Sequence, residues 1–297
     1  MKKTFIILVS LLSFITLSAQ DIKKMVVEEG GSGPYKAVMT TDASLTTHTI
    51  FKPADLSSFN ENNPIPVLIW GNGACTDSPW EHVNFLNEIA SNGFIVVAIG
   101  KMPEKLYERP DAGSSASSKL TDAMNWIIAQ NANPTSQYYK KIDVWNMAVA
   151  GMSCGGLQTL DVAKDPRIRT IMICNSGLFN KSNASSAVPG MPMPEKERLA
   201  EIHCPIIYIL GGPEDIAYEN GMDDFSKINH VPAFAANFPV GHGGTYAKPF
   251  GGEFAVVAVN WLKWQLKSDA AAGKLFKGSP CGLASREGWS ADKKNIP

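Results

Sequence analysis

Apolar residues in the middle of the chain come in short, almost unbroken runs, separated by longer stretches with helical spacing. The runs, of which the last is the weakest, are residues 65–70, 94–99, 147–150, 168–173, 205–210 and 233–238. Continuous apolar runs of about four to eight residues are typical of strands buried on both faces of a parallel sheet. The stretches with helical spacing are residues 81–91, 115–129, 157–163, 221–228 and 253–267.

This alternation of strand and helix predicts an α/β fold with a mostly parallel, doubly wound sheet and helices on both faces. Before it, residues 35–41 and 47–51 alternate and predict an antiparallel hairpin at the N-terminal edge. Functional residues are then expected at the carboxyl ends of the strands. Residues 177–195 are irregular and predict a lid loop beside the site. The tail after Gly273 is predicted to be a surface-packed or mobile end.

The N-terminal residues have the pattern of a secretory signal peptide. Two lysines precede an apolar run that ends near Leu17, and the small residues Ser18 and Ala19 follow. The run is shorter than the roughly 20 apolar residues that span a bilayer. Cleavage is expected after Ala19, so that residues 1–19 are the signal and residues 20–297 form one exported domain. The expected location is periplasmic or extracellular.

Composition narrows the expected partners. A formal net charge of −1 with 19% charged residues provides no basic stripe for nucleic acid. The chain has no phosphate-binding glycine loop, no C-x-x-C and no H-E-x-x-H, so neither a cofactor nor a metal is expected. An odd number of cysteines leaves at least one thiol without an intramolecular partner. The cysteines are Cys75, Cys154, Cys174, Cys204 and Cys281.

The most informative stretch is residues 147–158 (MAVAGMSCGGLQ), where a buried strand runs into G-x-S-x-G and then into helical spacing. This pattern indicates a nucleophile elbow, which holds a serine on a tight strand-to-helix turn. Gly151, Gly155 and Gly156 leave the room that such a turn needs. The helix that follows points backbone amides at developing negative charge. Ser153 is therefore the predicted nucleophile.

The chain resembles the α/β-hydrolases, nearest to the secreted dienelactone-hydrolase-like and small carboxylesterase branches. The resemblance covers nearly all of the mature chain. It rests on residues 70–75 (WGNGAC), the elbow, residues 211–215 (GGPED) and residues 241–243 (GHG). In one respect the chain departs from dienelactone hydrolases, which carry cysteine at the apex of the elbow. The serine at this position puts their particular substrate chemistry in doubt.

In that family the nucleophile, the acid and the histidine follow in this order, which makes Asp215 and His242 the expected partners of Ser153. His242 lies between glycines past the last apolar strand, and a neutral imidazole takes up a serine proton. Asp215 follows the strand at 205–210 and would orient the imidazole. The other carboxylates here are Asp224, the next candidate, Glu214 and Asp223. The remaining histidines, His48, His82, His203 and His230, are interpreted as structural or surface residues.

The resemblance also implies an oxyanion hole made of two backbone N–H groups. One belongs to Cys154, and the other to Ala74 or Cys75 in the glycine-rich loop. Cys154 is a rival nucleophile, but it lies one residue past the apex, where its side chain is expected to turn inward. If the fold brings Cys75 beside Cys154, a disulfide would hold the hole in its working geometry. The alternatives for Cys281 are pairing with Cys174 or with Cys204.

The leading functional hypothesis is an exported serine carboxylesterase that cleaves a small or carbohydrate-linked ester through an acyl-enzyme intermediate. Trp80, beside the oxyanion loop, and Tyr218, just past Asp215, are predicted to line the pocket. A peptidase or amidase with the same triad is one alternative, and a non-catalytic hydrolase fold used for binding is another. The expected partner is the ester substrate, small or polysaccharide-linked, and neither nucleic acid nor a membrane. The oligomeric state is not predicted.

Overall fold

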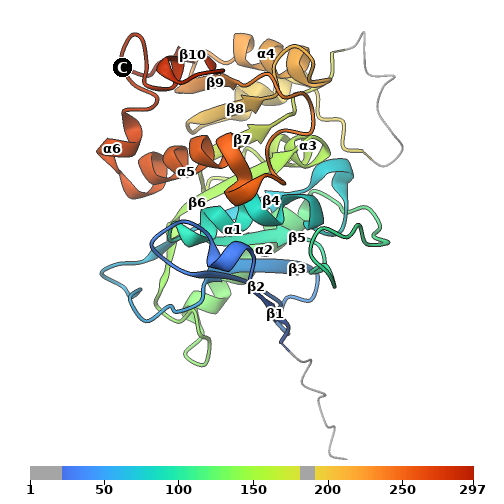
Figure 1. Cartoon of the computed structure of the whole chain (residues 1–297), viewed down its shortest axis with the longest axis vertical. Helices are drawn as coiled ribbons and strands as arrows, with labels where there is room; N and C mark the ends of the chain where they lie inside the picture. The colour runs from blue at the N-terminus through green and yellow to red at the C-terminus, as the bar shows by residue number, and fades with distance from the viewer. Residues whose placement is uncertain (1–21, 181–190) are drawn as a thin grey trace, which may run out of the picture.

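The computed structural model describes residues 22–180 and 191–297. The strands within these ranges form one mixed sheet in the order β1-β2-β3-β5-β4-β6-β7-β8-β9-β10 (Figure 1). The strands are Lys24–Met25 (β1), Ala37–Thr40 (β2), His48–Pro53 (β3), Ile65–Gly71 (β4), Ile95–Ile99 (β5), Ile142–Met152 (β6), Ile168–Cys174 (β7), Ile206–Leu210 (β8), Ala233–Asn237 (β9) and Ser290–Lys294 (β10).

The centre of the sheet is parallel, and both of its edges are antiparallel. β4 pairs in parallel with β5 on one side and with β6 on the other, and β7, β8 and β9 continue the parallel part. The chain therefore winds outward from β4 in both directions. At such a switch point the carboxyl ends of the strands leave a crevice in which ligands bind in open α/β sheets.

Helices cover both faces of this sheet. The α-helices are Val83–Ser91 (α1), Ser118–Ala132 (α2), Cys154–Asp161 (α3), Tyr218–Lys227 (α4), Gly252–Lys267 (α5) and Ala270–Gly273 (α6). The short 3₁₀ helices are Glu28–Gly30 (η1), Gly73–Cys75 (η2), Trp80–His82 (η3), Lys196–Glu201 (η5), Pro249–Gly251 (η6) and Leu283–Ser285 (η7). The buried side chains of α1 and α5 belong to one hydrophobic cluster, and those of α2, α3 and α4 belong to the other.

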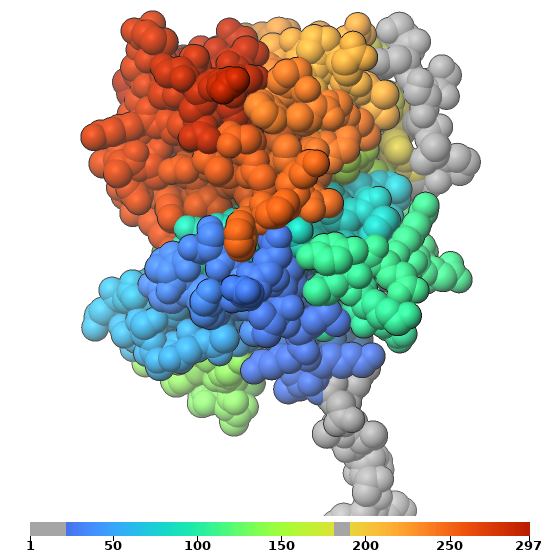
Figure 2. Space-filling view, viewed as in Figure 1, coloured from blue at the N-terminus to red at the C-terminus, as the bar shows by residue number. Residues whose placement is uncertain are grey.

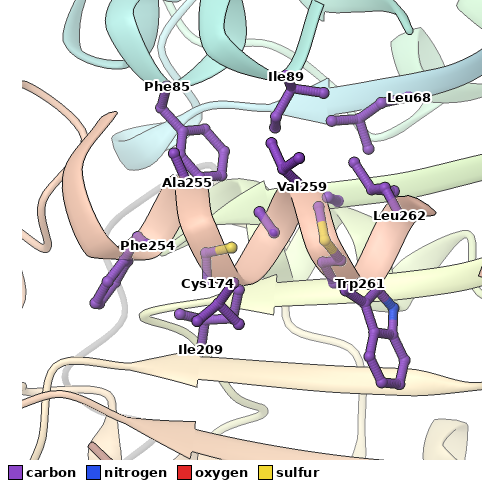
Figure 3. Close-up of a cluster of buried hydrophobic side chains, with 14 of the residues drawn as sticks. Leu68, Phe85, Ile89, Cys174, Ile209, Phe254, Ala255, Val259, Trp261 and Leu262 are labelled. Atoms are coloured by element: carbon purple, nitrogen blue, oxygen red, sulfur yellow. The ribbon is translucent and has the colours of Figure 1, made fainter. Parts of the chain in front are cut away.

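The two clusters follow from the alternation of side chains along each strand. In β4, Leu68 and Trp70 join the cluster under α1 and α5, whereas Val67 and Ile69 join the opposite one. Figure 3 shows how α5 fills the first cluster: its apolar side chains meet those of the central strands on one side and those of α1 on the other. The central strands are thus buried on both faces, as their unbroken apolar runs predict.

The N-terminal segments lie at one end of the molecule and the C-terminal segments at the other (Figure 2). The predicted N-terminal hairpin is confirmed, because β2 and β3 pair antiparallel. The predicted buried strands and helices are also confirmed, although their ends are shifted. β6 is longer than predicted and begins at Ile142. Of the two alternatives predicted for the tail, surface packing is confirmed and a mobile end is wrong for β10, which pairs antiparallel with β9 at the edge of the sheet. Trp289 and Ile296, on either side of β10, are buried and anchor it.

Two predictions fall outside the described residues. The signal peptide at 1–19 lies entirely outside them, and so do residues 181–190 of the predicted lid loop. Across the ranges that the structure describes, no helix combines the length and apolar character needed to cross a membrane.

Candidate active site

A sharp turn joins β6 to α3, with Ser153 at its apex. Ser153 has φ 53° and ψ −117°. A positive φ is unfavourable for a residue with a Cβ and persists only where the surroundings enforce it. Here the Ser153 N–H donates to the Cys174 carbonyl at 3.0 Å, and its carbonyl accepts the Ser176 hydroxyl at 2.7 Å. The end of β7 and the residues after it thus hold the turn in place.

Glycines let three backbone segments meet at this turn. A Cβ at Gly151 would lie 2.2 Å from the Gly155 carbonyl oxygen, and one at Gly155 would lie 2.1 Å from the carbonyl oxygen of Gly71. A Cβ at Gly156 would lie 2.4 Å from that of Ser176. Because such contacts with fixed neighbours are too short for real atoms, the sequence G-x-S-x-G-G is what allows α3 to begin directly beside the end of β4.

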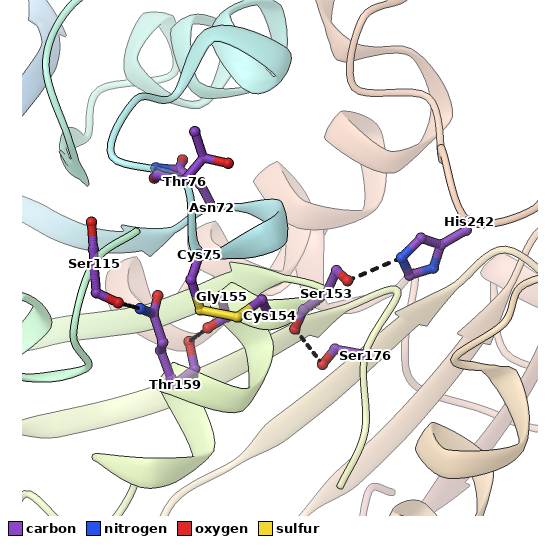
Figure 4. Close-up of a disulfide and its surroundings, with 11 residues drawn as sticks. Asn72, Cys75, Thr76, Ser115, Ser153, Cys154, Gly155, Thr159, Ser176 and His242 are labelled. Atoms are coloured by element: carbon purple, nitrogen blue, oxygen red, sulfur yellow. Dashed lines mark hydrogen bonds between the residues drawn. A yellow bond between two sulfur atoms is a disulfide. The ribbon is translucent and has the colours of Figure 1, made fainter. Parts of the chain in front are cut away.

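The structure brings together the three residues that the sequence analysis predicts to act as a unit. His242 Nε2 lies 3.0 Å from Ser153 Oγ, and His242 Nδ1 lies 2.6 Å from Asp215 Oδ1. Figure 4 shows the Ser153 hydroxyl pointing at the His242 ring. Since an ionised carboxylate only accepts hydrogen bonds, the neutral ring carries its proton on Nδ1 and offers Nε2 to the serine O–H. The next candidate acid, Asp224, instead accepts from the Leu178 N–H and from Lys196.

Asp215 is buried, with 0% of its side chain exposed. Burial by itself raises the pKa of Asp215, but hydrogen bonds from His242, Ala217, Gly211 and Asn175 outweigh it, so the pKa lies below its usual value. The carboxylate therefore stays charged beside the imidazole. The His242 side chain, in contrast, is 27% exposed.

The loop between β4 and α1 packs against the start of α3, next to the elbow. It forms the 3₁₀ turn η2, in which Ala74 and Cys75 have φ of 52° and 51°. The Cys75 N–H donates to the Asn72 carbonyl at 3.2 Å. Among the described residues, the N–H groups of Ala74 and Cys154 have no backbone acceptor in the surrounding turns and loops. Of the two predicted donors in this loop, Ala74 is therefore the one whose N–H is not already engaged.

A disulfide joins Cys75 to Cys154, which confirms the hypothesis of a bond between these two residues (Figure 4). Both sulfurs belong to buried residues. The proposed pairing of Cys281 with Cys174 or Cys204 is wrong, because all three are free and buried, each packed as a small apolar side chain. Burial raises the pKa values of the Cys174 and Cys204 thiols to about 12, so both stay protonated.

Two polar residues near the triad were missed by the sequence reasoning. Asn175 follows β7 directly, and its amide bonds to Asp215. Tyr246 lies four residues after His242 and bonds to Asn175. The signal for Asn175 was present, because it is a polar residue at the carboxyl end of a buried strand. Nothing in the sequence marks Tyr246.

The other histidines have structural surroundings. His48, His203 and His230 each bond to a backbone carbonyl through Nε2. His82 is buried against the rings of Trp70 and Tyr246, and burial lowers its pKa to about 3, so it stays neutral.

The predicted pocket residues Trp80 and Tyr218 are partly buried, at the start of η3 and of α4. Their contact with a substrate stays a prediction. A cavity of about 940 Å³ opens beside the oxyanion loop. Its lining includes Asp77 and Ser78 but none of the three triad residues. The three triad residues thus lie outside this cavity.

A family model described as PET hydrolase-like matches residues 49–270. No curated protein matches the chain.

Within the described ranges, no three His, Cys, Asp or Glu side chains lie close enough together to hold a metal ion.

Proposed function

Because this chain belongs to the PET hydrolase-like family of the α/β-hydrolase superfamily, we propose that it is a serine carboxylesterase with Ser153, His242 and Asp215 as its catalytic triad. The observation that carries the proposal is the unbroken series of contacts from Asp215 through His242 to the Ser153 hydroxyl. Such a series is the general arrangement of an activated serine nucleophile.

In the proposed reaction, the Ser153 oxygen attacks the ester carbonyl carbon while His242 Nε2 takes the hydroxyl proton. Negative charge then develops on the carbonyl oxygen, where the N–H groups of Ala74 and Cys154 would stabilise it. His242 gives its proton to the departing alcohol, which leaves an acyl group on Ser153. Water activated by the same imidazole releases the acid and restores the serine.

The surroundings of the triad support a substrate that is larger than the site itself. Ile216, next to Asp215, is 82% exposed, and Val240, two residues before His242, is 40% exposed. Exposed apolar side chains next to triad residues in the chain favour an ester group carried on a bulky, partly apolar body. The family model is named for hydrolysis of PET, a polyester. We therefore propose polyesters beside small and carbohydrate-linked esters as the substrate class.

The test is a panel of p-nitrophenyl esters of rising acyl length, with wild type and Ser153→Ala. The wild type is expected to prefer short acyl chains, and Ser153→Ala is expected to lose activity by about 10⁴-fold or more. Ser226→Ala serves as the matched control, because that hydroxyl bonds to the Asp223 carbonyl within α4 and not to a triad residue. The corresponding anilides, run in parallel, distinguish an esterase from an amidase.

A fluorophosphonate label identifies the nucleophile independently of the substrate chosen. It is expected to modify Ser153 in the wild type and to leave Ser153→Ala unmodified. Labelling at a different serine, or no labelling together with no turnover, would remove the basis of the proposal.

We also propose that the protein is exported. The support is the lysine-led apolar N-terminus, followed by Ser18 and Ala19. N-terminal sequencing of protein collected outside the cytoplasm is expected to begin at Gln20, whereas a retained Met1 would contradict export.

A further inference from the structure

Asn175 occupies a strained position at the carboxyl end of β7. It has φ 42°, and none of its surface is exposed. Asparagine enters this left-handed region more readily than most residues, so backbone geometry alone is one explanation for its presence. The contacts of its side chain point to a second role.

The side-chain amide of Asn175 joins the two loops that carry the acid and the base. Its Nδ2 donates to Asp215 Oδ2 at 2.7 Å and to the Gly241 carbonyl at 3.3 Å. Gly241 immediately precedes His242. One NH₂ group therefore ties the carboxylate to the backbone beside the imidazole.

The orientation of this amide is fixed by its partners. If the amide were rotated by half a turn, its oxygen would face the Asp215 carboxylate and the Gly241 carbonyl, and both are acceptors. In the observed orientation, Asn175 Oδ1 accepts the Tyr246 hydroxyl. Burial and the nearby Cys174 and Asp215 raise the pKa of Tyr246 well above its usual value, so the hydroxyl keeps the proton that it donates.

Tyr246 is itself held by aromatic packing. Its ring centroid lies 5.0 to 5.4 Å from those of His82, Phe85 and Phe254, and the rings meet edge to face. This is the preferred geometry for aromatic pairs. The hydroxyl thus projects from a rigid base toward Asn175.

We propose that Asn175 and Tyr246 are positioning residues, which hold the Asp215 carboxylate in line with His242. The amide shares Oδ2 with the Gly211 N–H, and Oδ1 is left for His242 Nδ1 and the Ala217 N–H. Neither residue touches the reacting atoms, and both act through Asp215. The inference rests on the proposed hydrolase function, because it assigns these residues a part in that same triad.

Asn175→Gly separates the two explanations. Glycine keeps the positive φ without strain and removes only the amide. The kcat is expected to fall about 10- to 100-fold with KM within about twofold, as for other groups that orient a reactive side chain. Asn295→Gly is the matched control. Asn295 also has a positive φ, 55°, and its Nδ2 also donates to two carbonyls, those of Asn229 and Val231, far along the chain from the triad.

Asn175→Asp gives a readout that loss of packing would not produce. When the introduced carboxyl is protonated, its O–H donates to Asp215 as the amide does, and when it is ionised the two carboxylates repel each other. The kcat/KM of the variant relative to wild type is therefore expected to fall as the pH rises from about 6 to about 9. Asn87→Asp, at a buried asparagine of α1 that bonds to the Val27 carbonyl, is expected to give a constant ratio.

Tyr246→Phe removes the hydroxyl and keeps the ring. Its kcat is expected to fall about 3- to 10-fold, because the amide of Asn175 loses the donor that fixes its orientation. Tyr208→Phe is the control, since that buried hydroxyl faces Asp224 rather than the triad. Thermal melts accompany all variants, so that a drop in kcat at an unchanged folded fraction is assigned to positioning. Should Asn175→Gly not fold, Asn175→Asp and Tyr246→Phe decide the question.

The possible failures are distinct. If the wild type turns over esters and Asn175→Gly, Asn175→Asp and Tyr246→Phe keep its kcat and pH profile, the positioning role is refuted and the hydrolase stands. If the wild type neither turns over esters nor reacts with fluorophosphonate at Ser153, the proposed function fails and this inference fails with it.

Discussion

At the scale of one residue, local hydrogen bonds set the pKa of the Asp215 carboxylate. Folding lowers the pKa of Asp215 from 3.8, because the hydrogen bonds from His242 and its other donors outweigh burial. The folded protein therefore binds fewer protons at this group than the unfolded chain does. The resulting stability is fully present above the unfolded pKa and is lost as the pH falls through the folded one. At neutral pH the charge on Asp215 is constant.

Asp215→Asn is expected to lower kcat by about 10⁴-fold, because an amide no longer selects the Nδ1–H tautomer or stabilises the imidazolium. Asp224→Asn is the control. Asp224 is also buried, but it holds Leu178 and Lys196 rather than a histidine. Its replacement is expected to change kcat by less than about tenfold. Steady-state kinetics at neutral pH measure both. Equal losses in the two variants would mean that the acid has been misassigned.

The residues of the site differ in how clearly the sequence pattern identifies them. Ser153 and His242 are each flanked by glycines after a buried strand, and that local pattern is sufficient to single them out. The position of Asn175 after a buried strand is a weaker signal, and its contact with Tyr246 joins residues 71 positions apart in the chain. No local pattern encodes a contact of that kind.

Among the elements, the link between η2 and α3 is the feature that most directly shapes the site. The disulfide between Cys75 and Cys154 closes a sequence separation of 79 residues. It joins η2, which carries the proposed oxyanion donor Ala74, to the residue that follows Ser153, the proposed nucleophile. The two loops whose N–H groups would stabilise the oxyanion are thus held at a fixed distance before substrate binds, which is what electrostatic preorganisation requires.

The double variant Cys75→Ser/Cys154→Ser is expected to lose about 2–4 kcal/mol in free energy of unfolding, because the unfolded chain gains the freedom of the opened loop. Its kcat is also expected to fall, with KM little changed, because the hole acts in the transition state. Cys281→Ala, at a buried free cysteine, is the control for loss of a sulfur. Urea unfolding and steady-state kinetics measure the two effects. An unchanged kcat in a destabilised double variant would limit the disulfide to stability.

Prediction of the elements succeeded where burial leaves a continuous apolar run and failed where strands are exposed. The central strands and their helices follow the sequence pattern because both faces of the sheet are covered. The first half of β6 escaped prediction since Asp143 and Asn146 interrupt its apolar residues and Trp145 is 81% exposed. β10, with the sequence SADKK, is polar because it lies at an edge of the sheet.

At the scale of the whole molecule, the edge strand β10 protects the sheet against pairing with other chains. An unpaired edge of a sheet is a template for association with other chains. β10 covers the edge of β9 along its whole length, from Ser290 opposite Asn237 to Lys294 opposite Ala233. β10 itself carries the charged residues Asp292, Lys293 and Lys294. Charges on an edge strand oppose pairing with the strand of another chain.

Buried contacts on both sides of β10 hold it in place. The Trp289 ring stacks on Phe238 at 5.0 Å, and its Nε1–H donates to Glu253 at 2.9 Å. At the last residue of the strand, Lys294 Nζ donates to oxygens at the end of α4, among them the carbonyls of Phe225 and Ser226. A cation at the C-terminus of a helix also interacts favourably with its dipole. The tail is therefore part of the folding unit.

A chain that ends at Gly288 is expected to lose at least about 3–5 kcal/mol of folding free energy, the usual cost of deleting one buried tryptophan. It is also expected to associate, because the edge of β9 becomes unpaired. Asp292→Ala keeps the strand and changes only an exposed side chain, so its stability is expected to stay within about 0.5 kcal/mol of wild type. Urea unfolding and light scattering measure these outcomes. A truncated chain with the association state and the stability of the wild type would show that β10 contributes neither to folding nor to protection of the β9 edge.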